Sequence, residues 1–214
     1  MGTSRFSHED VEVTETETVY KGFFRMQQYR LRHRLYGGGW SGSLKRELLV
    51  RGNATCVLPY DPVADQVVLC EQFRIGALLH ERSPWLLELV AGINEPGESS
   101  ESVAVREAEE EAGLILLGLE KICDYLTSPG GSSESVELWC GRIQIPASAG
   151  IFGLADEGED IHTRIMGRQQ AYEAIAAGRI YNAATIMALQ WLQLNHHRLR
   201  EQWGPGRPVG TDFA

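Results

Sequence analysis

One stretch of this sequence constrains the fold more than any other. Residues 92–114 read GINEPGESSESVAVREAEEEAGL, which places seven carboxylates and one arginine between glycines. Ser99 or Ser100 can cap a helix that runs to about Ala112, and Gly113 suits the left-handed conformation that ends a helix. The apolar run WLLELV comes directly before this stretch. The sequence therefore predicts a strand that leads into an acidic helix.

The helix is expected to pack on a sheet through one apolar face. At about 100° per residue, that face contains Val105, Ala108 and Ala112. The rest of the chain supplies strands for the sheet, among them ATCVLPY and QVVLCEQF around the turn DPVAD, then KICDYLT and SVELWCGRIQI. RQQAYEAIAA predicts a short helix stopped by Gly178, and Asn182 is the expected N-cap of a longer one. Strands and helices do not alternate regularly, which favours an α+β or sandwich-like fold.

Composition narrows the class of protein. The chain has 214 residues and a formal charge of −9, which disfavours nonspecific nucleic-acid binding because that requires a basic surface. No apolar run approaches a membrane span, and the N-terminal residues lack a signal-peptide core, so a cytoplasmic protein is expected. The four cysteines have no CxxC spacing and lie in strand-like runs, which predicts buried free thiols rather than a zinc site or disulfides.

The acidic helix poses a charge problem. Glu107, Glu110 and Glu111 fill an arc about 100° wide beside the apolar face. Like charges three or four residues apart cost about 0.2–0.5 kcal/mol per pair on an exposed helix. Arg106 can offset only part of this charge. Taken alone, the glutamates could form a solvated acidic face; alternatively, a divalent cation balances them, and carboxylate ligands suit Mg²⁺ or Mn²⁺ held together with substrate phosphate.

The spacing of these residues resembles the signature of the Nudix hydrolases, Gx₅Ex₇REUxEExGU, in which U is an apolar residue. The matching positions are Gly92, Glu98, Arg106, Glu107, Ala108, Glu110, Glu111, Gly113 and Leu114. The small Ala108 is the weakest match. The resemblance implies an α+β fold, a Nudix α/β/α sandwich with a mixed sheet, to which a small N-terminal antiparallel β-domain is added. We expect that β-domain at 1–50, the Nudix domain at 51–203 and a flexible tail at 204–214.

The resemblance also implies a metal site. Nudix enzymes hydrolyse a nucleoside diphosphate linked to another group, with two or three Mg²⁺ or Mn²⁺ ions against the pyrophosphate. The implied metal ligands are Glu107, Glu111, the backbone carbonyl of Ala91, and Glu110. Arg106 would orient the glutamates, while Glu98 would help to fix the loop.

Outside the signature, the chain resembles the bacterial ADP-ribose pyrophosphatases from about residue 10 to residue 203. The segment YLTSPGGSSE carries Pro129 sixteen residues after Gly113, where that group has a proline, and GLADEGEDI is a second acidic loop. In the resembling enzymes a glutamate of this loop is the base for the attacking water. Glu157 takes that place and Glu159 is the alternative, although the loop taken alone could be only solvated.

The remaining expectations concern substrate and assembly. Phe23 can stack on adenine, and Arg46, Arg51 and Arg74 can bind phosphate, although each arginine could equally sit in a surface ion pair. Glu134 is expected to contact the terminal ribose or to stabilise its turn. The resemblance implies ADP-ribose hydrolysis in a homodimer with shared active sites. The alternatives are GDP-mannose or ADP-glucose hydrolysis, or a nucleotide sensor that does not hydrolyse; the intact signature disfavours the sensor.

Overall fold

The computed structural model describes residues 5–154 and 158–205. The chain divides into two compact units, Met1–Asn53 with Leu126–Ser135, and Ala54–Tyr125 with Val136–Ala214. The predicted boundary was at residue 50. In addition, the segment Leu126–Ser135 groups with the N-terminal strands rather than with the larger unit. Most of the predicted tail, residues 206–214, lies outside the described residues.

The smaller unit is a three-stranded antiparallel sheet. Its strands are β1 (Val11–Lys21), β2 (Arg25–His33) and β3 (Leu44–Val50), in that order. The segment Leu126–Ser135 joins this unit through β3, since the Leu49 N–H donates to the Gly131 carbonyl at 2.8 Å. The small N-terminal antiparallel sheet that the resemblance implied is therefore present.

The larger unit is built on an eight-stranded mixed sheet. The main path is β10-β11-β5-β4-β9-β8; β6 pairs with β5 and β7 with β4. The pair β4·β9 is parallel, whereas β5 is antiparallel to both β4 and β11. The strand bounds are β4 Ala54–Asp61, β5 Gln66–Phe73, β6 Trp85–Glu88, β7 Val90–Ile93, β8 Gly118–Leu126, β9 Ser135–Arg142, β10 Ile151–Phe152 and β11 Ile161–Gly167.

A wedge opens in the middle of this sheet. Strands β4 and β5 pair only next to their turn, at Tyr60–Val67 and Asp61–Gln66. Beyond that point β6 pairs with β5 and β7 pairs with β4, so the two short strands lie between the diverging ones. The run WLLELV, predicted as one strand, thus changes partner at Leu89. This change brings the beginning of the acidic stretch beside β4.

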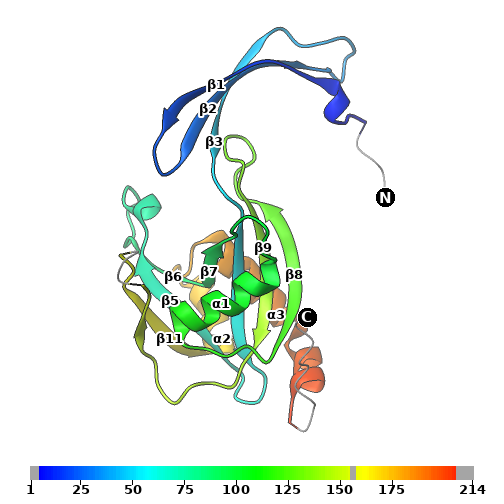
Figure 1. Cartoon of the computed structure of the whole chain (residues 1–214). Coiled ribbons are helices and arrows are strands. Elements are labelled where there is room, and N and C mark those ends of the chain that lie inside the picture. Colours follow the sequence, from blue (N-terminus) through cyan, green and yellow to red (C-terminus); the bar gives the residue numbers. More distant parts are fainter. Residues whose placement is uncertain (1–4, 155–157, 206–214) are drawn as a thin grey trace. The chain divides into compact units, whose positions relative to one another are not determined.

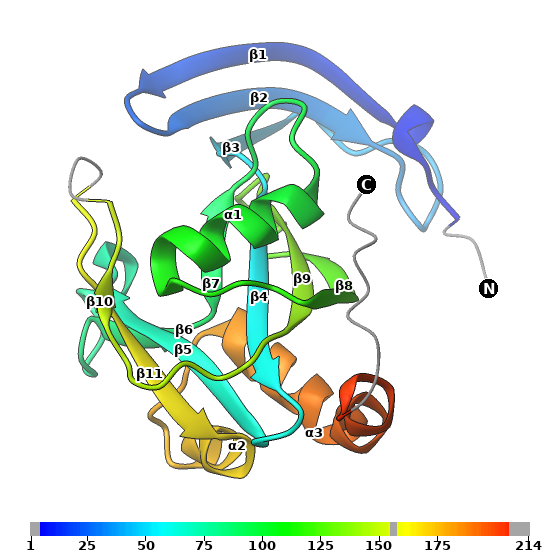
Figure 2. The same cartoon turned by 60° about the horizontal axis from the view of Figure 1, so that its bottom comes forward.

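Helices cover both faces of the sheet, as Figures 1 and 2 show. Helix α1 (Ser100–Ala112) covers one face, and α2 (Arg168–Ala176) and α3 (Ala183–Trp203) cover the other. Two buried clusters follow: Ala104 and Ala108 of α1 pack in one, whereas Ala171 of α2 and Leu189 of α3 pack in the other. The expected α+β sandwich with a mixed sheet and a small N-terminal antiparallel sheet is confirmed.

Helix α1 begins and ends as the sequence indicates. The Ser99 side chain accepts a hydrogen bond from the Ser102 N–H, and Gly113 is left-handed with φ of 62°. The predicted apolar face is wrong at one position, because Val105 is 37% exposed. It lies at the edge of the buried face, which is centred near Ala104. The buried helix residues are Ser100, Val103, Ala104, Ala108, Glu111 and Ala112.

The other expectations from composition can be checked in the described residues. All four cysteines are free, three of them buried and Cys123 only partly so. No helix in the ranges 5–154 and 158–205 has the length and apolar character to cross a membrane.

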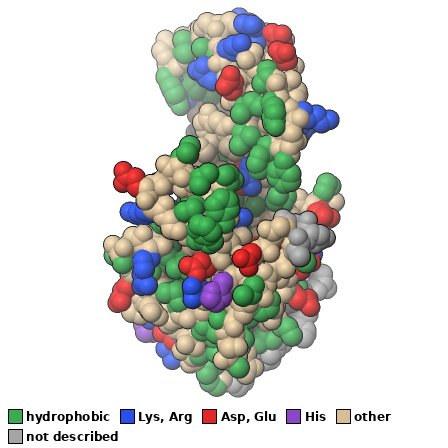
Figure 3. Space-filling model, turned by 90° about the vertical axis from the view of Figure 1, so that its left-hand side faces the viewer, with side chains coloured by type: hydrophobic (Ala, Val, Ile, Leu, Met, Phe, Trp, Pro, Cys, Tyr) green, Lys and Arg blue, Asp and Glu red, His purple; other side chains and the backbone are tan. Residues whose placement is uncertain are grey.

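The connection between β5 and β6 exposes Ile75, Leu78 and Leu79. Figure 3, viewed from that side, shows hydrophobic side chains gathered near acidic, basic and histidine side chains.

Candidate active site

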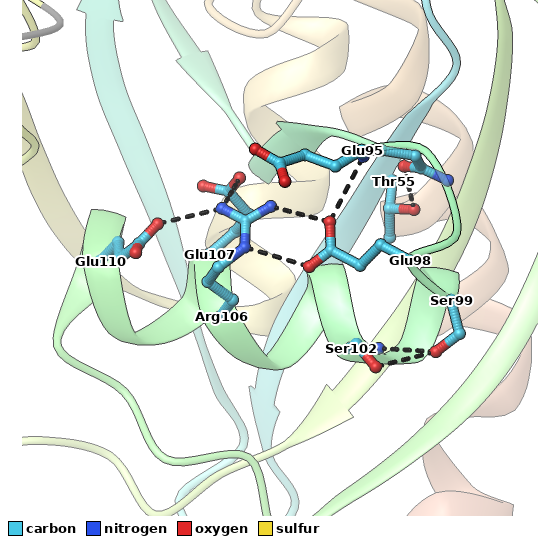
Figure 4. Close-up of polar contacts among 9 residues, drawn as sticks. Thr55, Glu95, Glu98, Ser99, Ser102, Arg106, Glu107 and Glu110 are labelled. Carbon is cyan, nitrogen blue, oxygen red and sulfur yellow. Dashed lines mark hydrogen bonds and ion pairs between the residues drawn. The ribbon is translucent and has the colours of Figure 1, made fainter.

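The loop before α1 is fixed by its own polar side chains (Figure 4). The Thr55 hydroxyl of β4 donates to Asn94 Oδ1 at 2.8 Å, which ties the end of β7 to the sheet. Glu98 accepts a hydrogen bond from the Glu95 N–H, and Ser99 then caps the helix. Helix α1 therefore starts at a fixed distance from β7, and its carboxylates lie at a defined place over the sheet.

Arg106 is the centre of the charged cluster. Its guanidinium binds Glu98 through Nε at 3.2 Å and Nη2 at 3.3 Å, and through Nη1 it contacts Glu107 at 2.6 Å and Glu110 at 3.1 Å. Figure 4 shows this single guanidinium between three carboxylates. Hydrogen bonds from Arg106 lower the pKa of Glu98. Arg106 contacts Glu98, Glu107 and Glu110, an arrangement that fits the expected orienting role.

Glu111 lies on the buried side of α1. Its residue is only 2% exposed, and its Oε2 accepts a hydrogen bond from the Ala91 N–H at 2.9 Å. Burial raises the pKa of Glu111 to about 8; the Ala91 N–H opposes this shift, the nearby Glu107 adds to it, and Arg74 opposes it. A carboxylate that is so little exposed, and that forms no ion pair with an arginine of the described residues, favours a cationic partner.

Glu107 fills the space beside a glycine of β7. An ideal Cβ at Gly92 would lie 1.7 Å from Glu107 Oε1, so any larger residue would displace this carboxylate. Burial raises the pKa of Glu107, although Arg106 opposes the shift. A glycine is therefore required at position 92 for a steric reason: because it has no side chain, Glu107 can lie against the edge of the sheet.

The donor set fits a hard divalent cation. Glu107 and Glu111 are four residues apart on one helix and supply oxygen ligands that Mg²⁺ and Mn²⁺ prefer. Within the ranges 5–154 and 158–205, no three Asp, Glu, His or Cys side chains are already grouped as metal ligands. The contacts explain this, since Glu107 and Glu110 point to Arg106 while Glu111 is tied to Ala91. The Ala91 carbonyl and the glutamates remain predicted ligands.

Arg74 lies near this cluster and has a partner that the sequence did not reveal. It forms an ion pair with Glu88 of β6 at 2.6 Å. Glu88 pairs with Cys70 in the sheet, on the face that α1 covers. Burial raises the pKa of Glu111 and the nearby charge of Arg74 opposes this rise, which places the predicted phosphate ligand in the same electrostatic environment as the predicted metal ligands. Glu88 could have been noticed only as a charged residue inside the apolar run WLLELV.

The other predicted substrate residues belong to the smaller unit. Phe23 is 87% exposed and stacks edge-to-face on Phe24, with ring centroids 4.8 Å apart. Arg51 lies over the other ring of this pair, 5.1 Å from the centroid of Phe24, and contacts Glu134 at 3.0 Å. Phe23, Arg51 and Glu134 are thus linked through Phe24, a residue that sequence reasoning missed although it follows Phe23 directly.

Two of these arginines still have hydrogen-bonding capacity. The Nε of Arg51 is buried without a hydrogen-bond partner in the described part of the chain. Arg46, on β3, donates only to the carbonyl of its neighbour Lys45 at 2.9 Å among the bonds found for its side chain. Arg46 can therefore offer N–H groups to a ligand, whereas the Nε of Arg51 is buried in this structure; the roles of both arginines in substrate binding stay predictions.

The second acidic loop is described only in part. Glu157, the predicted base, lies outside the described residues. The alternative Glu159 closes the base of this loop: its Oε2 accepts from the Leu154 N–H at 3.1 Å, and its own N–H donates to the Leu154 carbonyl at 3.2 Å. Burial is the main cause of the raised pKa of Glu107 and of Glu111, and the charge of Glu159 makes a smaller contribution in the same direction. The loop therefore begins and ends beside the cluster on α1.

The family described as NUDIX domain matches residues 50–180. The chain belongs to the Nudix family. It is 50% identical over 198 residues to an ADP-ribose pyrophosphatase of Escherichia coli strain K12, a match that covers 92% of this chain and 95% of that protein. It is 34% identical over 151 residues to a GDP-mannose pyrophosphatase of Cronobacter sakazakii, covering 70% of this chain and 78% of the relative.

A solved structure described as an ADP compounds hydrolase shares the fold of this Nudix protein. The TM-score is 0.68 at 19% identity, and the alignment covers 93% of this chain and 99% of that one. The alignment includes nearly the whole chain, so the likeness extends beyond the segment that the family matches. At this identity it supports the fold alone.

Proposed function

We propose that this Nudix protein hydrolyses the pyrophosphate bond of ADP-ribose to AMP and ribose 5-phosphate. The observation that carries the proposal is the 50% identity to an ADP-ribose pyrophosphatase over nearly the full length of both proteins. The cluster of Arg106, Glu107, Glu110 and Glu111 is intact, which supports a hydrolase over a nucleotide sensor. Hydrolysis of GDP-mannose or ADP-glucose is less supported, because the GDP-mannose pyrophosphatase has the lower identity and coverage.

The reaction adds one water across the pyrophosphate. The water oxygen bonds to one phosphorus, the bond from that phosphorus to the bridging oxygen breaks, and the other phosphate leaves with that oxygen. We propose Glu157 as the base that takes the proton of the attacking water. Arg106 holds Glu107 and Glu110 in position, and Arg74 with Arg46 and Arg51 would bind the phosphates.

We further propose Mg²⁺ or Mn²⁺ as the cofactor, with two or three ions per site. Glu107, Glu111, the Ala91 carbonyl and Glu110 would hold them. Divalent ions bound there would neutralise the diphosphate and lower the pKa of water. The burial of Glu111 supports this assignment, because no arginine or lysine side chain within 5–154 and 158–205 forms an ion pair with this carboxylate.

Assembly and location complete the proposal. A homodimer in which N-terminal strands help to form the partner's site would cover apolar side chains that the smaller unit exposes. These are Val11, Val13, Val19, Tyr20 and Phe23. Exposed apolar surface of this kind is typical of an interface. Free thiols at all four cysteines support a cytoplasmic location.

A substrate panel tests the proposed function. The protein is incubated with Mg²⁺ and, separately, ADP-ribose, ADP-glucose, GDP-mannose or NADH, and the products are identified by chromatography and mass spectrometry. We expect the highest kcat/KM for ADP-ribose, with AMP and ribose 5-phosphate as products. A higher kcat/KM for GDP-mannose would reassign the substrate, and absence of hydrolysis with all four would refute the enzyme.

A further inference from the structure

The larger unit has a cavity on the face of the sheet away from α1. Its volume is about 560 Å³, which is within the usual range for small-molecule sites. Strand residues that point to the α2 and α3 side line its floor: Leu87 of β6 and Met166 of β11 both belong to the cluster packed on these helices. The pairs Glu71–Leu87 and Phe73–Trp85 place Trp85 beside Leu87 on that face. None of the predicted active-site residues in the described part of the chain lines this cavity.

The rim of the cavity holds an arginine in a fixed position. Arg82 Nη1 donates to the Gly178 carbonyl at 3.2 Å, and the guanidinium lies 5.0 Å from the centroid of the Tyr181 ring. The guanidinium also lies against Gly178, where an ideal Cβ would be only 3.4 Å from Nη2. The Tyr181 hydroxyl in turn donates to the Ser83 carbonyl at 2.5 Å, which connects the two loops. Arg82 is thus ordered before any ligand binds, while its other N–H groups remain available.

A second arginine lines the same rim without a partner. The side chain of Arg179 is exposed and forms no hydrogen bond or ion pair with any residue of the described chain. The other charged residues of the lining, Glu71 and Arg164, neutralise each other in an ion pair. Two positive charges, from Arg82 and Arg179, are therefore left beside an apolar floor and an aromatic side chain.

We propose that this cavity binds a small organic phosphate with a planar body. Two guanidinium groups would bind the phosphate through paired hydrogen bonds, which is the geometry arginine favours. Trp85 and the apolar floor of Leu87 and Met166 would contact the planar part. The site is separate from the Nudix cluster and does not depend on the proposed function.

The test uses 1-naphthyl phosphate, with 1-naphthol and inorganic phosphate as partial probes, in the presence of EDTA. EDTA removes divalent ions, so phosphate binding at the Nudix cluster is not favoured. Binding is measured by the shift of the Trp85 indole signal in NMR, assigned with Trp85→Phe. We expect a Kd on the order of 0.1 mM for 1-naphthyl phosphate and at least ~10-fold weaker binding of either partial probe.

Variants locate the site. Arg179→Gln should weaken binding at least ~10-fold, because a charge-assisted pair of hydrogen bonds is lost. Arg82→Gln should weaken it similarly, and Arg200→Gln, which changes an exposed arginine outside the lining, should leave the Kd unchanged. Melting temperatures identify any variant that does not fold.

Three results would overturn the proposal. In the first, binding is unchanged in both Arg179→Gln and Arg82→Gln. In the second, binding is lost in Glu111→Gln, which would locate the probe at the Nudix cluster. In the third, 1-naphthol binds as tightly as 1-naphthyl phosphate, so that the two arginines contribute nothing. Each result can be obtained with folded protein, because Arg179 is exposed and Gln is tolerated at exposed positions.

Discussion

The helix α1 region and the N-terminal sheet hold their predicted site residues in different ways. On α1, four predicted residues are already in place: Arg106 contacts Glu107 and Glu110, and Glu111 is buried against Ala91. At the turn between β1 and β2, Phe23 is 87% exposed, and its one aromatic partner among the described residues is its neighbour Phe24. A charged cluster inside one unit is built by that unit alone. The exposed Phe23, by contrast, remains available for contact with another surface or with a ligand.

The difference has a physical origin. Buried carboxylates are costly unless they are hydrogen-bonded or paired, so the fold itself must satisfy the cluster on α1. Exposed aromatic and arginine side chains carry no such requirement. Substitutions of the predicted metal ligands on α1 should therefore lower kcat, whereas those of the predicted substrate residues in the N-terminal sheet should weaken substrate binding. The following predictions test this contrast, from the largest expected effect to the smallest.

Glu111→Gln should lower kcat about 10³-fold, because it removes a buried charged ligand while keeping the shape of the side chain. The melting temperature should change little, since a neutral amide is less costly to bury than a carboxylate. The matched control is Glu109→Gln on the exposed side of α1, which should retain activity. Equal activity of the two variants would contradict the metal assignment. Steady-state kinetics with Mg²⁺ and thermal unfolding are the measurements.

Glu157→Gln should lower kcat about 10²-fold and leave KM nearly unchanged, because a general base acts in the transition state. Glu159→Gln should have the smaller effect, since Glu159 holds the base of its loop through Leu154. The reverse order would assign the base to Glu159. If kcat falls by less than ~10-fold in both variants, neither glutamate of this loop is the base, and catalysis depends on the groups on α1.

Gly92→Ala should raise the Mg²⁺ concentration needed for half-maximal activity by about 10-fold or more. The added Cβ would lie 1.7 Å from Glu107 Oε1 and would displace this predicted ligand. Gly131→Ala serves as the control, because its Cβ would meet no atom within 4 Å. A metal titration of both variants decides whether the glycine matters through this contact.

Arg51→Gln should raise KM for ADP-ribose by about 10-fold with little change in kcat, as expected for a residue that binds substrate and transition state equally. Arg30→Gln, which breaks an exposed ion pair with Glu15 in the same sheet, is the control. A decrease in kcat without a change in KM would show that the two regions do not differ as we propose.

Val13→Lys should weaken the proposed dimer at micromolar concentration, because it puts a charge at a half-exposed apolar position of β1. Sedimentation velocity measures the effect, and Thr14→Lys is the control on the same strand. If both variants sediment like the unchanged protein, this surface of the sheet is not the interface.

The sequence predicted the helix and its charges well because short-range rules govern them. Ser99, Gly113 and the spacing of the glutamates each act within one or two helical turns. The ion pair of Arg74 with Glu88 joins the residue that follows β5 to a residue of β6, and only the pairing of these two strands brings them together. Val105 was assigned to the wrong side because residues at the edge of a helical face depend on the tilt of the helix on the sheet, which spacing does not determine.

The segment Trp85–Ile93, which fills the wedge between β4 and β5, serves two faces at once. Its residues alternate, with Trp85 and Leu87 toward α2 and α3, and Glu88 and Gly92 toward α1. Adding or removing one residue here would exchange the two sets, so that Leu87 would enter the charged cluster and Glu88 would enter an apolar layer. In laboratory evolution, a change of length in this segment should therefore be more damaging than a substitution at a position other than Glu88, Ala91 or Gly92. A library built on this chain should therefore place its insertions in the β5–β6 connection before Trp85.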